Sequence, residues 1–206
     1  MSKPVDRRSA LRHLLRVRRA SLTADERAAA ETAITVLIAG LPVLQNAAFV
    51  AGYRATRGEA NIDASLALVG ERGTVVTVPR VVGERLEFLP WDPSAETTIG
   101  SFGIEEPVNG IPVPFARHTA VLTPLVAFDR MGRRLGQGGG FYDRMMSKAD
   151  KTRPVMIGVA YAFQEVEEVP SEPWDQPLDA VVTQNEVIEF PASGVDLSGE
   201  DSRSVF

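Results

Sequence analysis

The sequence predicts an α/β domain of three layers, in which helices cover both faces of a mainly parallel sheet. Short apolar runs typical of buried strands alternate along the chain with segments of helical spacing. Strands that alternate with helices form parallel sheets through right-handed crossovers, and such sheets bind ligands at the carboxyl ends of their strands. The expected strands are residues 47–53, 74–79, 85–90, 120–128 and 154–161, followed by an apolar strand that Asp179 opens.

Length and composition indicate one domain with a sizeable core. The chain has 206 residues, of which 44% are hydrophobic, and we expect residues 1–191 to form the domain and residues 192–206 a flexible polar tail. No apolar run approaches the length of a membrane span, and a net charge of −5 argues against a general nucleic-acid-binding protein. The absence of cysteine excludes disulfides and cysteine–metal sites. We therefore expect a cytoplasmic monomer that has neither a membrane nor a nucleic acid as partner.

The first predicted helix covers residues 5–20 and combines a short leucine stripe with a basic face. Arg8, Arg12 and Arg16 repeat every four residues, so they share one side of the helix. Most basic faces of this kind are solvated. An arginine-rich start with few acids is also typical of an organelle transit peptide, but we expect this segment to belong to the mature domain.

The second predicted helix begins after Thr23 and ends near Gly40. Thr23 and Glu26 have the spacing of a capping box, and glycine is a common C-terminal stop. Ile34 and Ile38 lie one helical turn apart, which indicates a face directed at the core. We expect this long helix to support the sheet.

A polar loop over residues 54–63 follows the first strand and leads into a third helix. We expect Asn61 or Asp63 to cap this helix, which runs to about Glu71. Glu59 in the same loop, taken alone, is most simply a solvated carboxylate. The two strands beyond the helix are close enough in sequence to form a hairpin.

The segment from Leu122 to Met146 is the most informative part of the chain. Its strand pattern ends in a turn, and two arginines and four glycines in five positions then precede residues 141–146, which have the pattern of a helix start. Glycines with φ > 0 let successive backbone N–H groups converge on one phosphate, next to the positive end of a helix. Asp143 adds an oxygen ligand of the kind that phosphate-bound Mg²⁺ uses. A flexible surface turn explains the glycines about as well, and the spacing fits neither the Walker loop nor the dinucleotide fingerprint.

Several segments resemble one enzyme family. Residues 134–143, RLGQGGGFYD, resemble the RLGxGxGYYD signature of the 5-formyltetrahydrofolate cyclo-ligase family, also called 5,10-methenyltetrahydrofolate synthetase, and the preceding PLVAFDRMG is similar to its PGLAFD-x-x-G. Residues 8–12 resemble the family's Lys-x-x-Leu-Arg element, with arginine in place of lysine. Residues 174–183 resemble its HDxPLDxVVT segment, with Trp174 where many relatives have histidine. The resemblance covers residues 8–190 and implies the same α/β architecture.

The resemblance implies an ATP-dependent cyclisation of 5-formyltetrahydrofolate to 5,10-methenyltetrahydrofolate, with release of ADP and phosphate. The formyl oxygen is a poor leaving group, so the family is thought to phosphorylate it before N10 attacks the formyl carbon and phosphate departs. This chemistry requires positioning and charge neutralisation but no covalent nucleophile. A chain without cysteine or a visible catalytic triad is consistent with it.

The resemblance also implies which residues form the site, with Arg134 and Asp143 as the catalytic pair and Mg²⁺ held by Asp143, Asp179 and phosphate oxygens. The implied ATP-binding residues are Arg8, Arg12, Arg134, Leu135, Gly136, Gln137, Gly138, Gly139, Gly140, Phe141 and Tyr142. The implied folate-binding residues are Arg54, Glu59, Gln137, Gly138, Gly139, Gly140 and Phe141. Glu59 would accept hydrogen bonds from the amino-pyrimidine edge of the pterin.

Two other functions are compatible with a phosphate-binding glycine loop. One is a non-catalytic regulatory module that binds phosphate esters, and the other is an isomerase or transferase that acts on a phosphorylated sugar or on coenzyme A. Neither function needs Arg12, Glu59, Asp143 and Asp179 together, and the presence of all four favours the ligase.

Other conspicuous residues are expected to be structural. His13 and His118 are isolated and lack metal-ligand spacing. Residues 102–107, FGIEEP, resemble the family's FGIxEP and are expected to form a structural loop in which only Phe102 faces a ligand. The acid-rich residues 164–169 are expected to form a solvated turn.

Overall fold

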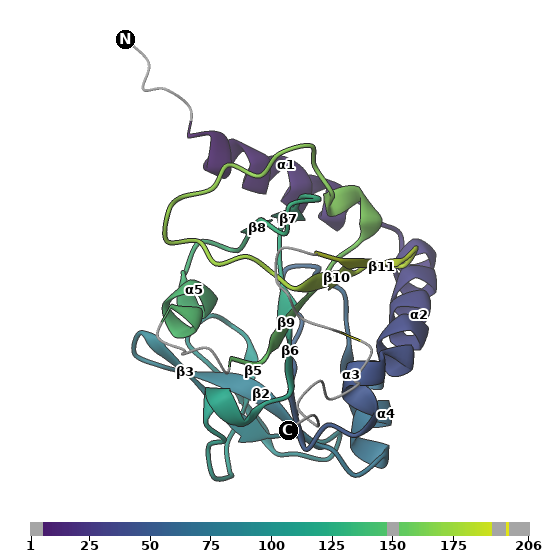
Figure 1. Cartoon of the computed structure of the whole chain (residues 1–206), viewed down its shortest axis with the longest axis vertical. Coiled ribbons are helices and arrows are strands. Elements are labelled where there is room, and N and C mark those ends of the chain that lie inside the picture. Colours follow the sequence, from purple (N-terminus) through teal and green to yellow (C-terminus); the bar gives the residue numbers. More distant parts are fainter. Residues whose placement is uncertain (1–5, 148–152, 191–196, 198–206) are drawn as a thin grey trace, which may run out of the picture.

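A seven-stranded sheet forms the centre of the fold (Figure 1). The computed structural model describes residues 6–147, 153–190 and Leu197. From edge to edge the strands are β11 (Val187–Glu189), β10 (Ala180–Val182), β9 (Val155–Val159), β6 (Ala120–Pro124), β1 (Phe49–Ala51), β2 (Val75–Val82) and β3 (Arg85–Pro90). Neighbours from β10 to β2 run parallel, whereas β11 and β3 run antiparallel to the strands beside them. The predicted mainly parallel sheet is confirmed, and so is the hairpin of β2 and β3, while strand β11 is an addition that the sequence analysis missed.

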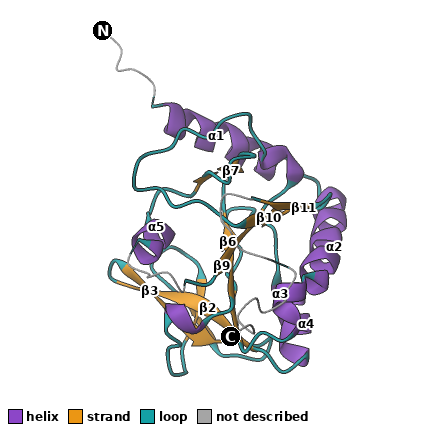
Figure 2. Cartoon of the chain, viewed as in Figure 1, coloured by secondary structure: helices purple, strands orange, loops and turns teal. Residues whose placement is uncertain are grey.

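Helices cover both faces of the sheet, as the three-layer prediction requires (Figure 2). The helices are α1 (Arg7–Ala20), α2 (Ala24–Gly40), α3 (Pro42–Gln45), α4 (Asp63–Glu71) and α5 (Phe141–Met146), with 3-10 turns at Phe115–Arg117 and Ala162–Gln164. Helices α2, α3 and α4 lie on one face, where Ile34 packs in the same cluster as Leu122 of β6. Helix α5 lies on the other face, where Met146 shares a cluster with Val121. Adjacent residues of β6 thus serve opposite layers, because side chains alternate along a strand.

Two smaller antiparallel pairs flank the main sheet. Strands β4 (Thr97–Ile99) and β5 (Glu105–Pro107) form one pair, and β7 (Ala127–Phe128) and β8 (Arg134–Leu135) form the other. Helix α1 packs on the second pair through Leu15, which is buried with Leu135. Segment 7–20 is therefore an integral part of the fold.

The apolar run at 120–128 is divided between two sheets. Strand β6 ends at Pro124, and the chain resumes a ladder only in β7. Between them the side-chain amide of Gln164 donates to the carbonyls of Leu125 and Val126, both at 2.9 Å. These bonds replace ladder partners for buried backbone groups. The prediction of a solvated turn over 164–169 is wrong at both ends, since Gln164 and Val169 are buried.

The predicted helix starts are confirmed for α2 and revised for α4. Thr23 and Glu26 form the capping box, with Glu26 N donating to Thr23 Oγ1 at 3.2 Å. The N-cap of α4 is Ile62, so neither Asn61 nor Asp63 occupies that position. The Asn61 side-chain oxygen nevertheless accepts from Asp63 N at 2.8 Å. It satisfies the first helical N–H from one residue outside the cap.

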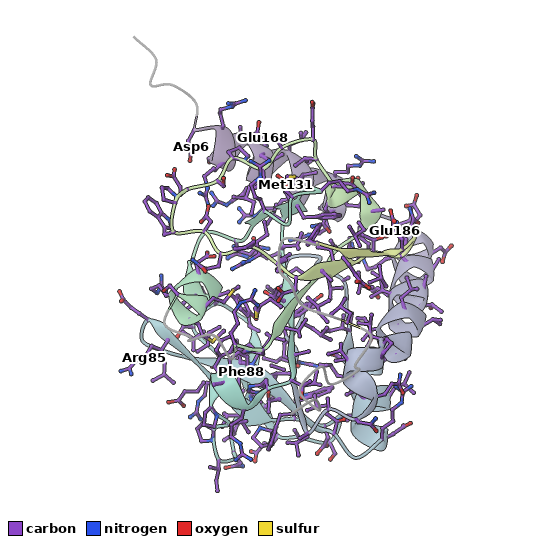
Figure 3. All side chains as sticks on the ribbon, in the orientation of Figure 1. Asp6, Arg85, Phe88, Met131, Glu168 and Glu186 are labelled. Atoms are coloured by element: carbon purple, nitrogen blue, oxygen red, sulfur yellow. The ribbon has the colours of Figure 1, made fainter. Side chains whose placement is uncertain are left out.

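Burial within the described residues separates core from surface as the pattern suggests. Phe88 of β3 points into the core, whereas Arg85 at the start of the same strand points away from the molecule (Figure 3). His118 is buried against Thr77, with 2.9 Å between His118 Nε2 and Thr77 Oγ1, which is consistent with a structural role. Of the predicted tail at 192–206 only Leu197 lies within the described residues; it is buried, and its carbonyl accepts from Val43 N at 3.1 Å. Across the described parts of the chain, no helix is long and apolar enough to cross a membrane.

Candidate active site

A cavity of about 530 Å³ opens beside the carboxyl ends of the central parallel strands. Tyr53 and Arg54, just after β1, and Pro124, the last residue of β6, belong to its wall. This is the position at which parallel α/β sheets bind ligands. The volume lies within the range of about 300–1,000 Å³ that is typical of small-molecule sites.

The glycine loop, residues 136–140, forms one wall of the cavity and connects β8 to α5. Gly138 has φ of 107° and Gly140 has φ of 64°, and residues other than glycine rarely adopt such positive φ angles. Gly139 does not have a positive φ, but a Cβ there would lie 2.9 Å from the ring of Phe141. Positive φ is thus confined to two of the four glycines, and close packing requires the third.

Helix α1 holds the glycine loop from outside. Arg12 Nε donates to the carbonyl of Gly136 at 2.9 Å, and Arg16 Nη2 donates to the backbone oxygen of Gln137 at 3.0 Å and to its side-chain oxygen at 2.6 Å. The basic face predicted on this helix is therefore not merely solvated. Burial lowers the pKa of Arg12, and the charges of Arg8 and Arg16 lower it further. Arg12 lines the cavity, and its Nη1 and Nη2 groups make no hydrogen bond to any described residue.

Arg8 also lines the cavity, but it is paired with Asp175. Its Nη1 and Nη2 groups donate to the Asp175 carboxylate at 2.7 and 3.3 Å, and this hydrogen bonding raises the pKa of Arg8. Asp175 and the exposed Trp174 thereby bring the segment before β10 to the cavity. Neither contact was predicted from the sequence, although both residues lie in the segment that resembles HDxPLDxVVT.

Arg134 and Asp143, the predicted catalytic pair, meet in the cavity. Arg134 Nη2 donates to Asp143 Oδ1 at 2.7 Å, and Gln176 N donates to the same oxygen at 3.3 Å. Burial lowers the pKa of Arg134, and the charge of Asp143 opposes that shift. The N-cap of α5 is Gly140, so Asp143 does not serve as the helix cap. Asp143 Oδ2 makes no hydrogen bond to a described residue, and it remains available to a ligand.

Glu59 is buried, contrary to its simplest interpretation as a solvated loop acid. Its side chain accepts from Gln137 Nε2 at 2.8 Å and from Thr56 N at 3.1 Å, and burial raises the pKa of the carboxyl group. Gln137 therefore connects Glu59, in the 54–63 loop, to the glycine loop and to Arg16 of α1. The resemblance implied that Gln137 binds ATP and folate, and it did not predict that Gln137 connects these three segments.

Arg54 lies at the edge of the cavity and is fixed by three neighbours. Its guanidinium forms ion pairs with Asp63 and Glu105 and lies 5.1 Å from the ring centroid of Trp91. Two carboxylates compensate its charge. Arg54 therefore presents a preorganised edge and no unbalanced cation to a ligand.

Aromatic rings form an apolar part of the wall. Phe102 and Phe141 meet edge to face with centroids 5.6 Å apart, and Phe102 lines the cavity as expected. Tyr142 also lines it, and burial and the charge of Glu59 raise the pKa of its hydroxyl. Leu135 is an exception among the predicted nucleotide-binding residues. Its side chain is buried against α1 and is not part of the cavity wall.

Asp179 does not reach the cavity. Its fully buried carboxylate accepts from Arg153 Nη1 at 2.5 Å and Nη2 at 2.8 Å, and from Met156 N at 2.7 Å. Both oxygens are therefore used to fix the start of β10 against β9. That Asp179 and Asp143 share a cation stays a prediction, and in this structure the carboxylate of Asp179 is paired with Arg153.

A metal ion at this site would depend on Asp143. Within residues 6–147, 153–190 and 197, no group of three or more histidine or carboxylate side chains is arranged to hold an ion. Phosphate-bound Mg²⁺ takes only one or two carboxylates and completes its shell with phosphate oxygens and water. Asp143, with one free oxygen beside the glycine loop, fits that requirement.

Comparison with known proteins gives concordant results. Residues 4–184 match the model of the 5-formyltetrahydrofolate cyclo-ligase family. The chain is 34% identical over 183 residues to the 5-formyltetrahydrofolate cyclo-ligase of Escherichia coli (strain K12). The alignment covers 86% of this chain and 100% of that protein. Over 177 residues it is 34% identical to the enzyme of the same name from Haemophilus influenzae, and this alignment covers 84% of this chain and 95% of that enzyme.

Two solved structures share the fold. The NMR structure of Aquifex aeolicus 5,10-methenyltetrahydrofolate synthetase superposes with a TM-score of 0.79 at 30% identity and covers 97% of this chain and 96% of its own. The structure of a 5,10-methenyltetrahydrofolate synthetase from Mycoplasma pneumoniae superposes with a TM-score of 0.71 at 23% identity, and the match covers 87% of this chain and 99% of that one. At that identity the second similarity concerns the fold alone.

Proposed function

The chain belongs to the 5-formyltetrahydrofolate cyclo-ligase family, and on that premise we propose that it uses ATP to cyclise 5-formyltetrahydrofolate to 5,10-methenyltetrahydrofolate, releasing ADP and phosphate. One observation carries the proposal. A single cavity joins a glycine loop lined by arginines to a buried carboxylate, Glu59, through the side chain of Gln137. The glycine loop and its arginines suit the phosphates of ATP, and the buried carboxylate suits the folate. Because both belong to one cavity, a phosphoryl group could pass from ATP to the folate.

The nucleotide phosphates are assigned to the Arg12 side of the cavity. Arg12 has uncommitted N–H groups there, and Arg8 and Arg134 line the same wall. Backbone N–H groups of a loop with αL residues converge on anions, as Gly138 and Gly140 allow. Arginine also matches phosphate oxygens with two parallel hydrogen bonds.

The pterin is assigned to Glu59. A buried carboxylate with a raised pKa gains most from a partner that supplies N–H donors, since donors favour its charged form. The amino-pyrimidine edge of a pterin offers such donors. Phe102 and Phe141 supply the apolar wall that the flat rings of a folate require.

The reaction then needs two bond-forming steps. The formyl oxygen attacks the γ-phosphorus of ATP and ADP leaves; N10 next attacks the formyl carbon and loses its proton, and the carbon–oxygen bond breaks to release phosphate. In the first step Arg12 and Arg134 neutralise charge on the transferring group, and in the second they hold the departing phosphate. Mg²⁺ bound to the nucleotide would add charge neutralisation, with Asp143 as its protein ligand. The chain supplies orientation and charge, and no covalent intermediate forms on it.

The test is a spectroscopic assay with the purified protein, 5-formyltetrahydrofolate and Mg·ATP. We expect near-ultraviolet absorbance of the methenyl product, with one ADP formed per product molecule and no signal when ATP is omitted. A regulatory module would bind ATP without turnover. Folded protein that binds ATP but yields no methenyl product would refute the proposed function.

A further inference from the structure

The arginines of the cavity differ in how their charge is compensated. Arg8, Arg54 and Arg134 form ion pairs with carboxylates. Arg57 forms no ion pair with a described residue, but it lies near enough to Glu59 for its positive charge to oppose the rise in the pKa of that carboxyl group. Arg12 also forms no ion pair with a described residue, although the charges of Asp6 and Asp175 act on it from a distance. Arg144 contacts only uncharged groups among the described residues.

Arg12 and Arg144 contact different parts of the glycine loop. Arg12 binds the carbonyl of Gly136, at its start. Arg144 lies at its end, where Nη1 is 2.8 Å from the position of a Cβ on Gly140. The cavity therefore has two positions that attract anions, one at Arg12 and one at Arg144. A nucleotide bound at the Arg12 side would leave the position at Arg144 open to a different anionic group.

Arg144 is held in place by uncharged groups. Its Nη2 donates to the backbone carbonyl of Glu84 at 3.2 Å, and its guanidinium carbon lies 5.0 Å from the ring centroid of Phe141. Glu84 belongs to the turn between β2 and β3, and α5 contacts β3 (Figure 1). The guanidinium is thus oriented at the exposed rim of the cavity, and no carboxylate of the described residues pairs with its charge.

We propose that Arg144 binds the glutamate carboxylates of the folate substrate. This inference rests on the proposed function, which puts a pterin at Glu59 and a benzoyl ring along the aromatic wall. The same molecule ends in a glutamate with two carboxylates, which need a cation near solvent. Arg144 stacks on Phe141 of that wall and lies at the rim, so one substrate can contact both.

The experiment compares two substrates in two variants. One substrate is 5-formyltetrahydrofolate, and the other is its analogue in which both glutamate carboxylates are carboxamides. In Arg144→Gln we expect the KM for 5-formyltetrahydrofolate to rise about tenfold, because one charge-assisted contact is lost. The KM values for the diamide and for ATP should stay unchanged, and Arg144→Lys should lose less than Arg144→Gln.

The matched control is Arg117→Gln. Arg117 is also an exposed arginine over a phenylalanine ring, 4.7 Å from the centroid of Phe49, but it does not line the cavity. We expect no change in any KM. This control separates a carboxylate contact from the general loss of a stacked surface arginine.

Three results overturn the proposal: an equal rise in KM for the acid and the diamide, no rise for either, or a rise confined to ATP. If the wild-type protein forms no methenyl product, the proposed function fails separately. Calorimetric affinities for the acid and the diamide, in wild type and Arg144→Gln, then still decide the role of Arg144.

Discussion

The start of helix α5 and the start of strand β10 each present an aspartate, and the two carboxylates have opposite surroundings. Asp143 is 26% exposed, faces the cavity and uses one oxygen, which accepts from Arg134 and Gln176. Asp179 is 0% exposed and uses both oxygens to bind Arg153 and Met156. Both residues lie beside an element boundary in segments that resemble one family.

The difference lies in the supply of hydrogen-bond donors. At Asp179 the guanidinium and a backbone N–H saturate the carboxylate within the protein, so a ligand would have to break an existing ion pair. At Asp143 no described residue binds the second oxygen, which lies beside a loop that can hold phosphate. Resemblance in sequence therefore marks both positions, and in this structure only Asp143 has a carboxylate oxygen that binds no described residue.

The largest expected effect is on turnover, in Asp143→Asn. Asparagine keeps an acceptor for Arg134 and Gln176 but loses the charge that would hold Mg²⁺. We expect kcat to fall about 10²–10³-fold, equivalent to about 3–4 kcal/mol. The measurement is kcat across a Mg²⁺ titration, with thermal unfolding to confirm that the variant is folded. A normal kcat with unchanged Mg²⁺ dependence would remove Asp143 from the mechanism.

The opposite pattern is expected for Asp179→Asn. The substitution weakens a buried charged contact, so the free energy of unfolding should fall by about 1.5–3 kcal/mol, as for hydrogen bonds to charged groups. The variant that remains folded should keep kcat and its Mg²⁺ dependence. Urea unfolding and the same titration decide the matter. If kcat falls as in Asp143→Asn while stability is retained, then the two aspartates act together and the comparison is wrong.

Glu59 is an intermediate case, buried like Asp179 yet on the cavity wall. Burial raises the pKa of Glu59 in the folded protein above its value in the unfolded chain. Between these two pKa values the carboxyl group is protonated in the folded protein and ionised in the unfolded chain. That contribution to stability is present below the unfolded pKa of about 4.3 and is lost as pH rises through the raised folded pKa. Urea unfolding at a series of pH values should show Glu59→Gln gaining stability relative to wild type over that window. A difference that does not vary with pH would contradict the raised pKa.

The smallest expected effect concerns the loop that positions Asp143. Gly140 has φ of 64°, so Gly140→Ala should lower the free energy of unfolding by about 1–2 kcal/mol and weaken ATP binding through the displaced glycine loop. Gly136→Ala is the matched control, because its φ is not positive and a Cβ there meets nothing within 4 Å. Thermal unfolding and ATP calorimetry on both variants test the pair. Equal effects at the two glycines would mean that the loop conformation does not depend on Gly140.

Local sequence signals were reliable where the cause is local. The capping box at Thr23 and Glu26 and the helix that follows the glycines need only neighbouring residues, and both are confirmed. The role of Gln164 was not predictable, because its amide bonds carbonyls nearly forty residues away in sequence. The burial of Glu59 and the pairing of Arg8 with Asp175 were missed for the same reason.

The sequence by itself determined the alternation of strands and helices, the family, the glycine loop, and the expectation that a ligand binds at the carboxyl ends of the strands. Periodicity, turn chemistry and motif spacing are properties of neighbouring residues, so they can be read along the chain. Only the tertiary structure decided which charges of the described residues pair with one another and which face the cavity. It committed Asp179 to Arg153 and Arg8 to Asp175, while it left Asp143, Arg12 and Arg144 facing the cavity. Whether a charge is used or available depends on partners brought close by folding, because electrostatic and hydrogen-bond energies depend on distance in space and not on separation in sequence.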